Sequence, residues 1–387
     1  MTKIYFILIF LLIFFSGCTI QSPSSQSCQS VLSHHFQPTG ITKKFDLPSD
    51  VLCYAFNLQV YTDKEGNENL YFLGRENKLL IYNISNEELS NSIVLQERGP
   101  NGVGKANGFF VLSPDSILVT SKYVQKFNFV DGAGQKVFSY NYRDDELVTS
   151  STISNYLTPF FFDASSNIYM PQCIEGNWTQ LPLSAFQQYR TTLSVNVKTN
   201  IKNKVGLAIP YNKSELKKKS FNYSATQAGK LFIFSFDGSD SIYVTKDFLN
   251  YQGLLCKSTH VFGDLACYLG TDDVQKLMKS KIESCYYTSV AWDPYREVIY
   301  RFYKLGETDL KESDDLFSLN HYPAKFGIMA INKNMEIVAD QVFESNKYFF
   351  GNYYISKEGL FLSINHPSNP EMDYNKLTFE LIKLEKN

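Results

Sequence analysis

The sequence predicts an all-β fold, a six-bladed β-propeller of four-stranded blades in which an N-terminal strand completes the last blade. Two observations support this prediction. Aromatic residues make up 15% of the chain, including 26 Tyr and 31 Phe, and such side chains are enriched on the pleated, half-buried surfaces of sheets. In addition, pairs of apolar runs joined by short turns recur along the chain, and such repeats are typical of propellers.

The clearest of these pairs lies at residues 290–304, which read VAWDPYREVIYRFYK. An apolar run reaches a tight turn at Asp293-Pro294-Tyr295-Arg296, and an alternating apolar run follows it, which is the pattern of a β-hairpin. Asp at the first position and Pro at the second suit a type I turn for backbone reasons alone. We therefore expect a structural role for this turn.

Five weaker copies of the hairpin occur, and each is expected to supply the first two strands of a blade. They span residues 54–73, 109–120, 160–170, 221–236 and 353–364. The turn centres lie near residues 66, 114, 165, 228, 295 and 358. A four-stranded blade needs about 40 to 50 residues, so the excess in the longer repeats is expected in loops.

Further apolar runs supply the third and fourth strands. The predicted pairs are 78–84 with 92–96, 126–130 with 135–140, 191–198 with 205–209, 240–245 with 260–269, and 326–332 with 336–343. The sixth unit has one such run, 377–384, so its missing strand is expected to be 42–47, from the other end of the sequence. This exchange closes the ring and removes exposed strand edges.

One helix is predicted at residues 272–283, where Val274, Leu277, Met278 and Ile282 fall on one helical face. The rival architecture is a pair of packed β-sandwich domains, because alternation of apolar residues alone does not distinguish sandwiches from propellers.

The N-terminus reads as an export signal. Lys3 precedes the apolar residues 4–15, a stretch shorter than the about 20 residues that span a bilayer, and Ser16-Gly17-Cys18 follows. Small residues before a cysteine resemble the bacterial lipobox, so we expect a signal peptide at 1–17 and acyl chains on Cys18 that hold the protein to a membrane. The alternative is an ordinary secretory signal.

Two segments follow the signal. Residues 18–40 are rich in Ser, Gln and other polar residues, which is typical of a flexible tether, and residues 41–387 are expected to form the single propeller domain.

Six cysteines follow Cys18, and an oxidising compartment would allow some of them to pair. Proximity in the sequence favours Cys256 with Cys267, although sequence does not choose among the pairings and buried free thiols are the equal alternative. The formal charge is −2 and no long basic run occurs, which argues against a nucleic-acid partner.

Several motifs together indicate a family. They are the lipobox, the segment 96–102 (QERGPNG), the turn at 292–296 followed by Tyr300-Arg301, and Gly359-Leu360-Phe361. In this combination the chain resembles the Bacteroidetes lipoproteins catalogued as domain of unknown function family 4221. The resemblance implies a six-bladed propeller without an established activity, so no catalytic residue can be assigned from it.

The resemblance also bears on location. In such lipoproteins an acidic cluster beside the lipidated cysteine favours the cell surface, and no such cluster follows Cys18. We therefore expect an outer-membrane lipoprotein that faces the periplasm.

Motifs for chemistry are few. Residues 99–105 match a phosphate-binding loop until Ala106 replaces the Ser or Thr that would hold magnesium, and the following residues read as a strand instead of the required helix. The five histidines lack metal-ligand spacing, and no G-x-S-x-G elbow occurs. We therefore predict no metal or other cofactor.

Propeller topology predicts a ligand-binding face. Loops that join second to third strands and one blade to the next emerge on one side, and here they include residues 98–107, 306–325 and 366–373. The candidate ligand residues on these loops are Arg98, Asn101, His321 and His366. The turn at 293–296 would lie on the opposite side.

Two short motifs, Asp115-Ser116-Ile117 and Asp240-Ser241-Ile242, resemble sites at which Bacteroidetes attach O-glycans to exported proteins. They predict glycosylation of Ser116 and Ser241, although patterns of three residues also arise by chance.

These observations favour a binding or scaffold protein of the envelope, with a protein, peptide or glycan partner, over an enzyme. The alternative is a hydrolase or lyase of glycans or lactones with polar residues gathered in the central channel, because propellers host both classes. The inner-strand stretches 55–60, 109–112 and 160–162 are largely apolar or aromatic, which favours binding.

Overall fold

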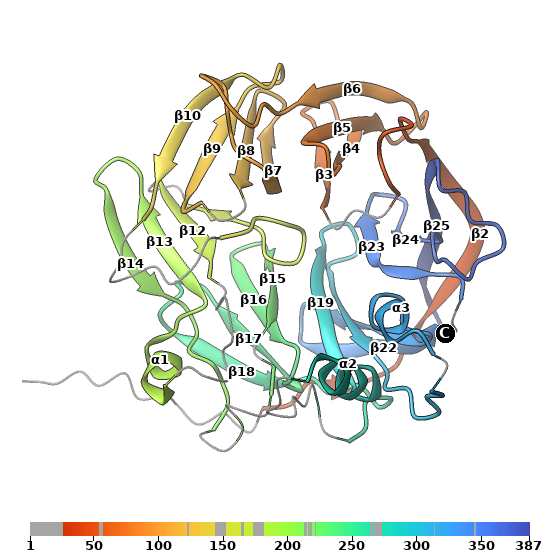
Figure 1. Cartoon of the computed structure of the whole chain (residues 1–387). Coiled ribbons are helices and arrows are strands. Elements are labelled where there is room, and N and C mark those ends of the chain that lie inside the picture. Colours follow the sequence, from red (N-terminus) through yellow and green to blue (C-terminus); the bar gives the residue numbers. More distant parts are fainter. Residues whose placement is uncertain are drawn as a thin grey trace, which may run out of the picture.

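The computed structural model describes residues 26–53, 57–121, 124–143, 152–163, 166–172, 182–212, 215, 219–220, 222–263, 265, 273–312, 314–343 and 346–387. Its strands form six sheets arranged as blades around a common axis (Figure 1). Within each blade, successive strands pair antiparallel. The predicted six-bladed propeller is therefore confirmed, and the alternative of two sandwiches is wrong.

The first three blades follow the chain in order. Blade 1 contains β3 (Leu58–Thr62), β4 (Glu68–Leu73), β5 (Lys78–Asn83) and β6 (Leu89–Val94). Blade 2 contains β7 (Ala106–Ser113), β8 (Ser116–Ser121), β9 (Lys126–Val130) and β10 (Lys136–Asn141). Blade 3 contains β11 (Phe161–Phe162), β12 (Asn167–Pro171), β13 (Thr192–Asn196) and β14 (Ile201–Val205).

The other three blades complete the ring. Blade 4 contains β15 (Tyr223–Ala228), β16 (Leu231–Phe236), β17 (Ser241–Thr245) and β18 (Tyr251–Leu255). Blade 5 contains β19 (Tyr286–Asp293), β20 (Val298–Lys304), β21 (Phe326–Asn332) and β22 (Glu336–Phe343), with the short β1 (Gln29–Ser30) outside β22. Blade 6 contains β23 (Phe349–Ile355), β24 (Leu360–Ser363), β25 (Lys376–Lys386) and β2 (His34–Asp46).

All six predicted hairpins are present, but two outer strands differ from expectation. In blade 4 the fourth strand is β18, which precedes the predicted 260–269, a stretch of which only 260–263 and 265 are described. After β18, Ser258 and Thr259 donate hydrogen bonds to the Asp340 carboxylate of β22, so this part of the chain lies against blade 5. In blade 3 the fourth strand begins at Ile201 instead of residue 205, because the preceding turn is tight, with Asn200 in the left-handed region at φ 59°.

Strand β2 closes the ring, as the sequence predicts. It pairs with β25 from His34 opposite Lys386 to Asp46 opposite Lys376, with a bulge between Pro38 and Thr42. The strand is longer than the predicted 42–47. The tether expected at 18–40 and the domain start expected at residue 41 must therefore be revised, since the folded chain already contains residues 26–40.

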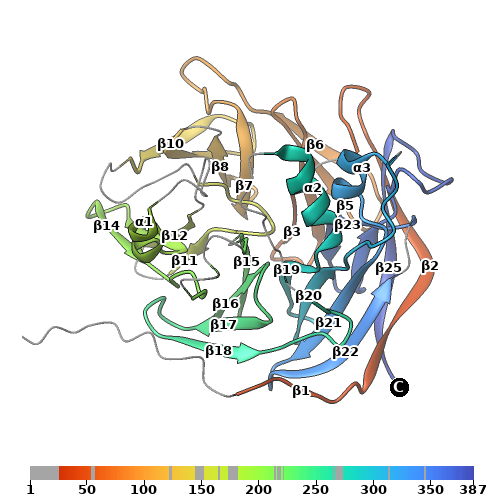
Figure 2. The ribbon, with the colours of Figure 1, turned by 60° about the horizontal axis from the view of Figure 1, so that its bottom comes forward.

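Residues 26–33, which we call the belt, run along the outer edges of blades 4 and 5 before β2 joins blade 6 (Figure 2). Ser27 forms a parallel bridge with Leu255 at the end of β18, and β1 then pairs in parallel with β22. The bridge brings Cys28 beside Cys256, with Cα atoms 4.9 Å apart, and the two form a disulfide.

This disulfide corrects the predicted pairing of Cys256 with Cys267, because Cys256 is bonded to Cys28. Cys267 lies outside the described residues. Cys53 and Cys285 are buried free thiols, the form that the alternative interpretation expected.

Hydrophobic clusters fill the space between neighbouring blades. One joins blades 6 and 1 around Phe45, Tyr82 and Phe361, and another joins blades 5 and 6 around Phe302 and Tyr353. The alternating side chains of each strand supply both faces of a blade, which explains the high aromatic content of the sequence.

A buried arginine holds blades 4 and 5 together. Arg301 of β20 is 0% exposed, and its guanidinium lies over the Tyr287 ring with Cζ 3.4 Å from the ring centroid. Its N–H groups donate to the Ser235 hydroxyl and to the carbonyl oxygens of Ser239, Asp240, Ser241 and Cys256, at 2.6 to 3.3 Å. A guanidinium has five N–H donors, so this site uses all of them.

Within the described residues, three helices accompany the strands: α1 (Leu183–Gln188), α2 (Val274–Glu283) and α3 (Leu316–His321). Helix α2 is the predicted one, and Asp273 caps its N-terminus by accepting hydrogen bonds from the backbone of Gln275 and Lys276. The C-terminal end of α2 is bound by the buried Lys304 of β20, which donates to the carbonyl oxygens of Ile282 and Ser284.

Among the described helices, none has both the length and the apolar character needed to cross a membrane.

Candidate functional site

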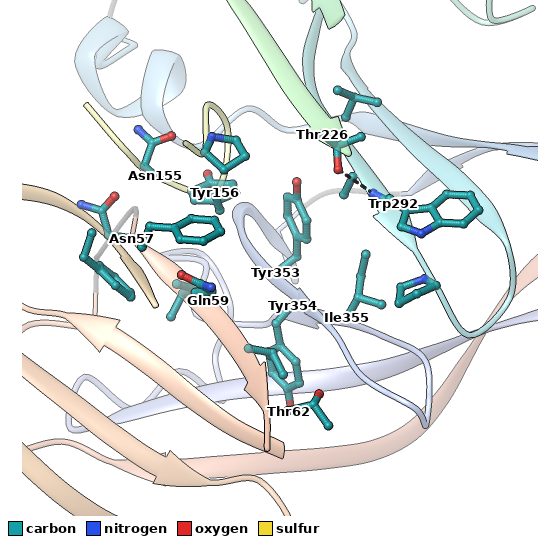
Figure 3. Close-up of a pocket in the computed structure, with 18 of the residues that line it drawn as sticks. Asn57, Gln59, Thr62, Asn155, Tyr156, Thr226, Trp292, Tyr353, Tyr354 and Ile355 are labelled. Carbon is teal, nitrogen blue, oxygen red and sulfur yellow. Dashed lines mark hydrogen bonds between the residues drawn. The ribbon is translucent and has the colours of Figure 1, made fainter. Parts of the chain in front are cut away.

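A cavity of about 300 Å³ lies on the axis of the ring, where the inner strands of five blades meet (Figure 3). Its walls come from β3, β7, β15, β19 and β23, together with residues 155, 156 and 159, which precede β11. Since each inner strand runs in the same direction along the axis, the cavity has two distinct ends. We call the end where first and second strands are joined the short-turn end and the other the loop end.

The segment 152–160 closes the axis at the loop end. The Tyr156 hydroxyl donates a hydrogen bond to the carbonyl oxygen of Gly351 in β23, on the blade opposite blade 3, and the Tyr156 ring meets the Tyr353 ring edge-on at 5.4 Å. The backbone of Leu157 accepts from Ala225 of β15 at 2.7 Å. A Cβ at Gly108 of β7 would lie 2.2 Å from the Ser154 oxygen, so this close approach requires glycine.

The turn at 293–296 lies at the short-turn end. The Asp293 carboxylate is 0% exposed and accepts hydrogen bonds from the Tyr300 hydroxyl at 2.9 Å, from the Arg296 guanidinium at 2.8 Å and from two backbone N–H groups of the turn. Arg296 also donates to the backbone of Ser356 in blade 6.

The same turn reaches a second blade and the cavity. The Tyr295 hydroxyl donates to the Glu68 carboxylate of blade 1 at 2.8 Å. Pro294 and Tyr295 also line the cavity. Sequence reasoning placed this turn away from any ligand site, whereas the structure places it beside the cavity.

Amide side chains fix the wall between blades 1 and 2. Gln59 of β3 pairs with the backbone of Val111 in β7, with its oxygen 2.8 Å from the Val111 nitrogen and its nitrogen 3.1 Å from the Val111 oxygen. Asn57 donates to the Asn107 oxygen at 3.2 Å, and its own side-chain oxygen is buried and accepts no hydrogen bond from the described residues. A buried acceptor without a partner is costly, and a ligand donor would satisfy it only if the Asn57 side chain turned its oxygen toward the cavity.

The opposite wall combines a hydroxyl with an indole. Thr226 of β15 accepts a hydrogen bond from the backbone nitrogen of Trp292 in β19 at 3.1 Å (Figure 3). This contact leaves the Thr226 hydroxyl hydrogen able to donate.

The cavity lining is uncharged and rich in aromatic residues. None of the residues that line it is Asp, Glu, Lys, Arg or His, and the aromatic members are Phe109, Phe110, Tyr156, Trp292, Tyr295, Tyr353 and Tyr354. Burial raises the pKa of Tyr353 and Tyr354, so both phenols are neutral near pH 7. In the part of the chain that the structure describes, no three His, Cys, Asp or Glu residues are arranged to hold a metal ion.

Two of the four predicted ligand residues lie in the loop between blades 1 and 2. Asn101 donates to the side-chain oxygen of Gln135, and Arg98 is exposed. The loop is a series of tight turns in which Gly102 bonds back to Gly99 at 2.9 Å, and strand β7 follows it instead of a helix. It is therefore an inter-blade loop.

The other two predicted residues lie together between blades 5 and 6. His321 ends α3, where its Nδ1 is 2.9 Å from the Phe317 oxygen, and its ring lies near that of Tyr322. His366 is 3% exposed, packs edge-on against the same Tyr322 ring, and has its pKa lowered by burial. The structure thus brings the two histidines near one tyrosine but far along the ring from Arg98, and none of the four lines the cavity.

The predicted modification sites fall at strand starts. Ser116 begins β8 and Ser241 begins β17, and both are half-buried. Their glycosylation stays a prediction. Cys18 lies outside the described residues.

Sequence reasoning missed Asn57, Tyr156 and Trp292 as site residues. Trp292 belongs to the predicted hairpin, on the inner strand next to the turn. This position was the one sign in the sequence that its side chain could face the axis. Tyr156 lies in an irregular segment, and no periodic pattern indicates that it crosses the axis.

Ring, blades and axial cavity together define this protein as a six-bladed β-propeller with an uncharged central site. Comparison with known families identifies it further: the chain belongs to the family described as Domain of unknown function (DUF4221), whose profile matches residues 36–322. The family resemblance noted in the sequence is therefore confirmed.

Comparison with solved structures shows the same fold in a member of this family. A crystal structure of a DUF4221 family member from Bacteroides vulgatus is similar with a TM-score of 0.81 and 21% identity, over 92% of this chain and 100% of that chain. The structure of U3-55K has a TM-score of 0.46 and 8% identity over 89% and 100% of the two chains, and a streptogramin B lyase has 0.44 and 10% over 92% and 100%. No curated protein sequence matches the chain.

Proposed function

We propose that this protein is a lipid-anchored binding protein of the cell envelope that holds a neutral saccharide unit in the axial cavity. The observation that carries the proposal is the cavity lining, which combines aromatic rings with amide and hydroxyl groups and contains no charged side chain. A volume of about 300 Å³ is at the small end of ligand sites, which suits one or two sugar rings.

The ligand class follows from the chemistry of the lining. Taking a charged ligand into a site without a countercharge would leave that charge desolvated and unpaired, which is costly. Aromatic rings such as Trp292 and Tyr353 present flat apolar faces on which the C–H face of a sugar can pack. The Asn57 oxygen and the Thr226 hydroxyl supply uncharged hydrogen-bonding groups for sugar hydroxyls.

The lining favours binding over the alternative of a glycan or lactone hydrolase or lyase. General acid and base catalysis needs groups that titrate near the working pH, and glycoside hydrolysis commonly uses two carboxylates. The Glu68 and Asp293 carboxylates near the short-turn end are each engaged by hydrogen-bond donors of the fold.

The envelope location is supported by two independent features. The lipobox at Cys18 predicts export and acylation, and the disulfide between Cys28 and Cys256 fits an oxidising compartment outside the cytoplasm. We propose the periplasmic face of the outer membrane as its location.

Calorimetric titration of the purified full-length protein with a panel of neutral oligosaccharides tests the ligand class, with uncharged and charged peptides as parallel arms. We expect an oligosaccharide to bind, and Trp292→Ala to weaken that binding at least tenfold. The matched control is Phe317→Ala, which removes a 61% exposed aromatic side chain outside the cavity and should leave the affinity unchanged. Binding only of peptides, or equal effects of the two variants, would contradict the proposal.

A further inference from the structure

The belt fixes where the folded domain is held to its anchor. The described part of the chain begins at Gln26, which the disulfide and the bridge of Ser27 to Leu255 attach to the outer edge of blade 4. Seven residues lie between Cys18 and Gln26, and eight Cα steps of about 3.6 Å in a fully extended chain place the attachment point within about 29 Å of the acylated cysteine. A tether that ended at residue 40 would have reached about 80 Å.

Exposed apolar side chains gather beside this attachment point. Leu255 is 48% exposed at the end of β18, Val31 and Leu32 are 45% and 43% exposed just after β1, and Phe262 is 73% exposed. Phe262 follows Val261, which packs in the same core cluster as Cys28 and Ile337. We call these four residues the rim patch.

The two segments that carry three of the four rim-patch residues have no charged side chain of their own, and the nearest charges are those of Lys257 and Glu336 beside them. Residues 26–33 read QSCQSVLS and residues 249–256 read LNYQGLLC, without an acidic or basic side chain in either segment. Charged side chains make up 20% of the whole sequence, so these two neighbouring uncharged segments differ from the average surface. A surface in which aliphatic and aromatic side chains stand beside few charges suits contact with the acyl and headgroup boundary of a bilayer.

We propose that the rim patch rests on the bilayer to which the protein is anchored, so that the propeller stands on the outer edges of blades 4 and 5. Because these outer strands lie at the circumference (Figure 2), this orientation places the ring axis roughly along the membrane plane. Both ends of the axis, including the short-turn end of the cavity, then face the aqueous space. The inference rests on the lipid anchor of the proposed function.

Photocrosslinking tests this orientation. The full-length acylated protein is placed in vesicles of phosphatidylethanolamine and phosphatidylglycerol, with Leu255 replaced by the photoreactive p-benzoylphenylalanine. The matched control carries the same replacement at Val94, which is 59% exposed on β6, the outer strand of blade 1 on the opposite side of the ring. We expect at least tenfold more lipid adducts, measured by mass spectrometry, at position 255 than at position 94.

Two further measurements separate the possible failures. Intact mass reports acylation of Cys18. An acylated protein with equal adducts at both positions would support the lipid anchor and contradict the orientation. A chain without acyl mass would contradict both. A variant with Val31→Ser, Leu32→Ser and Phe262→Ser, checked for an unchanged circular dichroism spectrum, should lose most adducts from the probe at position 255. Unchanged adducts in this variant would show that the rim patch does not make the contact.

Discussion

The hairpin of blade 5 and the segment that leads into blade 3 both reach the ring axis, and they do so by different means. Strands β19 and β20 are long and pair along their length with one bulge, between Tyr287 and Ser289, and the hairpin holds buried polar side chains in Asp293, Arg301 and Lys304. The segment 152–160 is irregular and leads into β11, which has two residues. The regular hairpin joins neighbouring blades, whereas the irregular segment crosses the axis and determines the depth of the cavity.

This difference shows how a repeated blade diversifies. Where the backbone groups of a strand are paired within its own blade, the side chains can form hydrogen bonds with another blade, as Arg301 does with blade 4. Where the inner strand is short, backbone enters the axis and must find partners across it, as Leu157 and Tyr156 do. Stability should therefore depend mainly on blade 5, and the shape of the site on the segment before blade 3.

The largest expected effect is from Arg301→Met. This change keeps much of the apolar stem but removes all five donated hydrogen bonds, including those to the carbonyl oxygens of Ser239 and Cys256 at the end of blade 4. We expect the free energy of unfolding to fall by about 3 to 5 kcal/mol, measured by urea denaturation without reductant. Lys333→Met is the control, because it removes an exposed pair with Glu297 and should cost less than about 0.5 kcal/mol. A similar loss in both variants would contradict this account of blade 5.

The next effect is a pH dependence from Lys304. Burial lowers the pKa of Lys304 from 10.5 to about 8. Between these values the unfolded chain binds a proton that the folded chain has released, so folding becomes more favourable as the pH rises through that window. We expect the wild type to gain up to about 3 kcal/mol relative to Lys304→Met between pH 8 and pH 10.5.

Urea denaturation of both proteins at intervals from pH 7 to pH 10.5 measures this difference, and titrations common to both chains cancel. The exposed Lys333→Met serves again as the control and should show a constant difference from wild type. A difference between wild type and Lys304→Met that is flat or falls with rising pH would show that burial does not depress this pKa.

The smallest expected effect is from Tyr156→Phe, which removes one neutral hydrogen bond across the axis and keeps the ring contact with Tyr353. The free energy of unfolding should fall by about 1 kcal/mol. Tyr61→Phe is the control, because the hydroxyl that it removes has no hydrogen bond to the described residues. Its free energy of unfolding should change less than that of Tyr156→Phe. Equal changes in the two variants would mean that the bond to Gly351 contributes nothing.

Local patterns in the sequence were sufficient for most of the fold. The hairpin turns, the helix α2 and the closing strand β2 each leave a signal of periodicity, turn residues or a missing partner. The outer strand of blade 4 was misplaced because residues 260–269 have an apolar pattern, whereas the strand is the earlier β18, and Ser258 and Thr259 beyond it bond to Asp340 of blade 5.

The site was less predictable than the fold. The disulfide joins cysteines 228 residues apart, and such a pairing has no local signal. The cavity depends on Tyr156 meeting Gly351 from the opposite side of the ring, which follows from three-dimensional closure and not from either segment alone. The predicted ligand residues on the loops were chosen from topology, and the cavity instead uses side chains of the inner strands.

The strand exchange in blade 6 also sets an order of events during synthesis. Strand β2 is made early, but its partner β25 belongs to the C-terminal end of the chain, so the last blade can form only when nearly the whole chain has emerged. Cys256 emerges well before β25, so the disulfide with Cys28 can join the N-terminal segment to blade 4 while the ring is still open. The early cross-link keeps β2 close to the place where β25 must arrive, and β2 is then at hand to cover the outer edge of β25, which would otherwise be exposed to other chains.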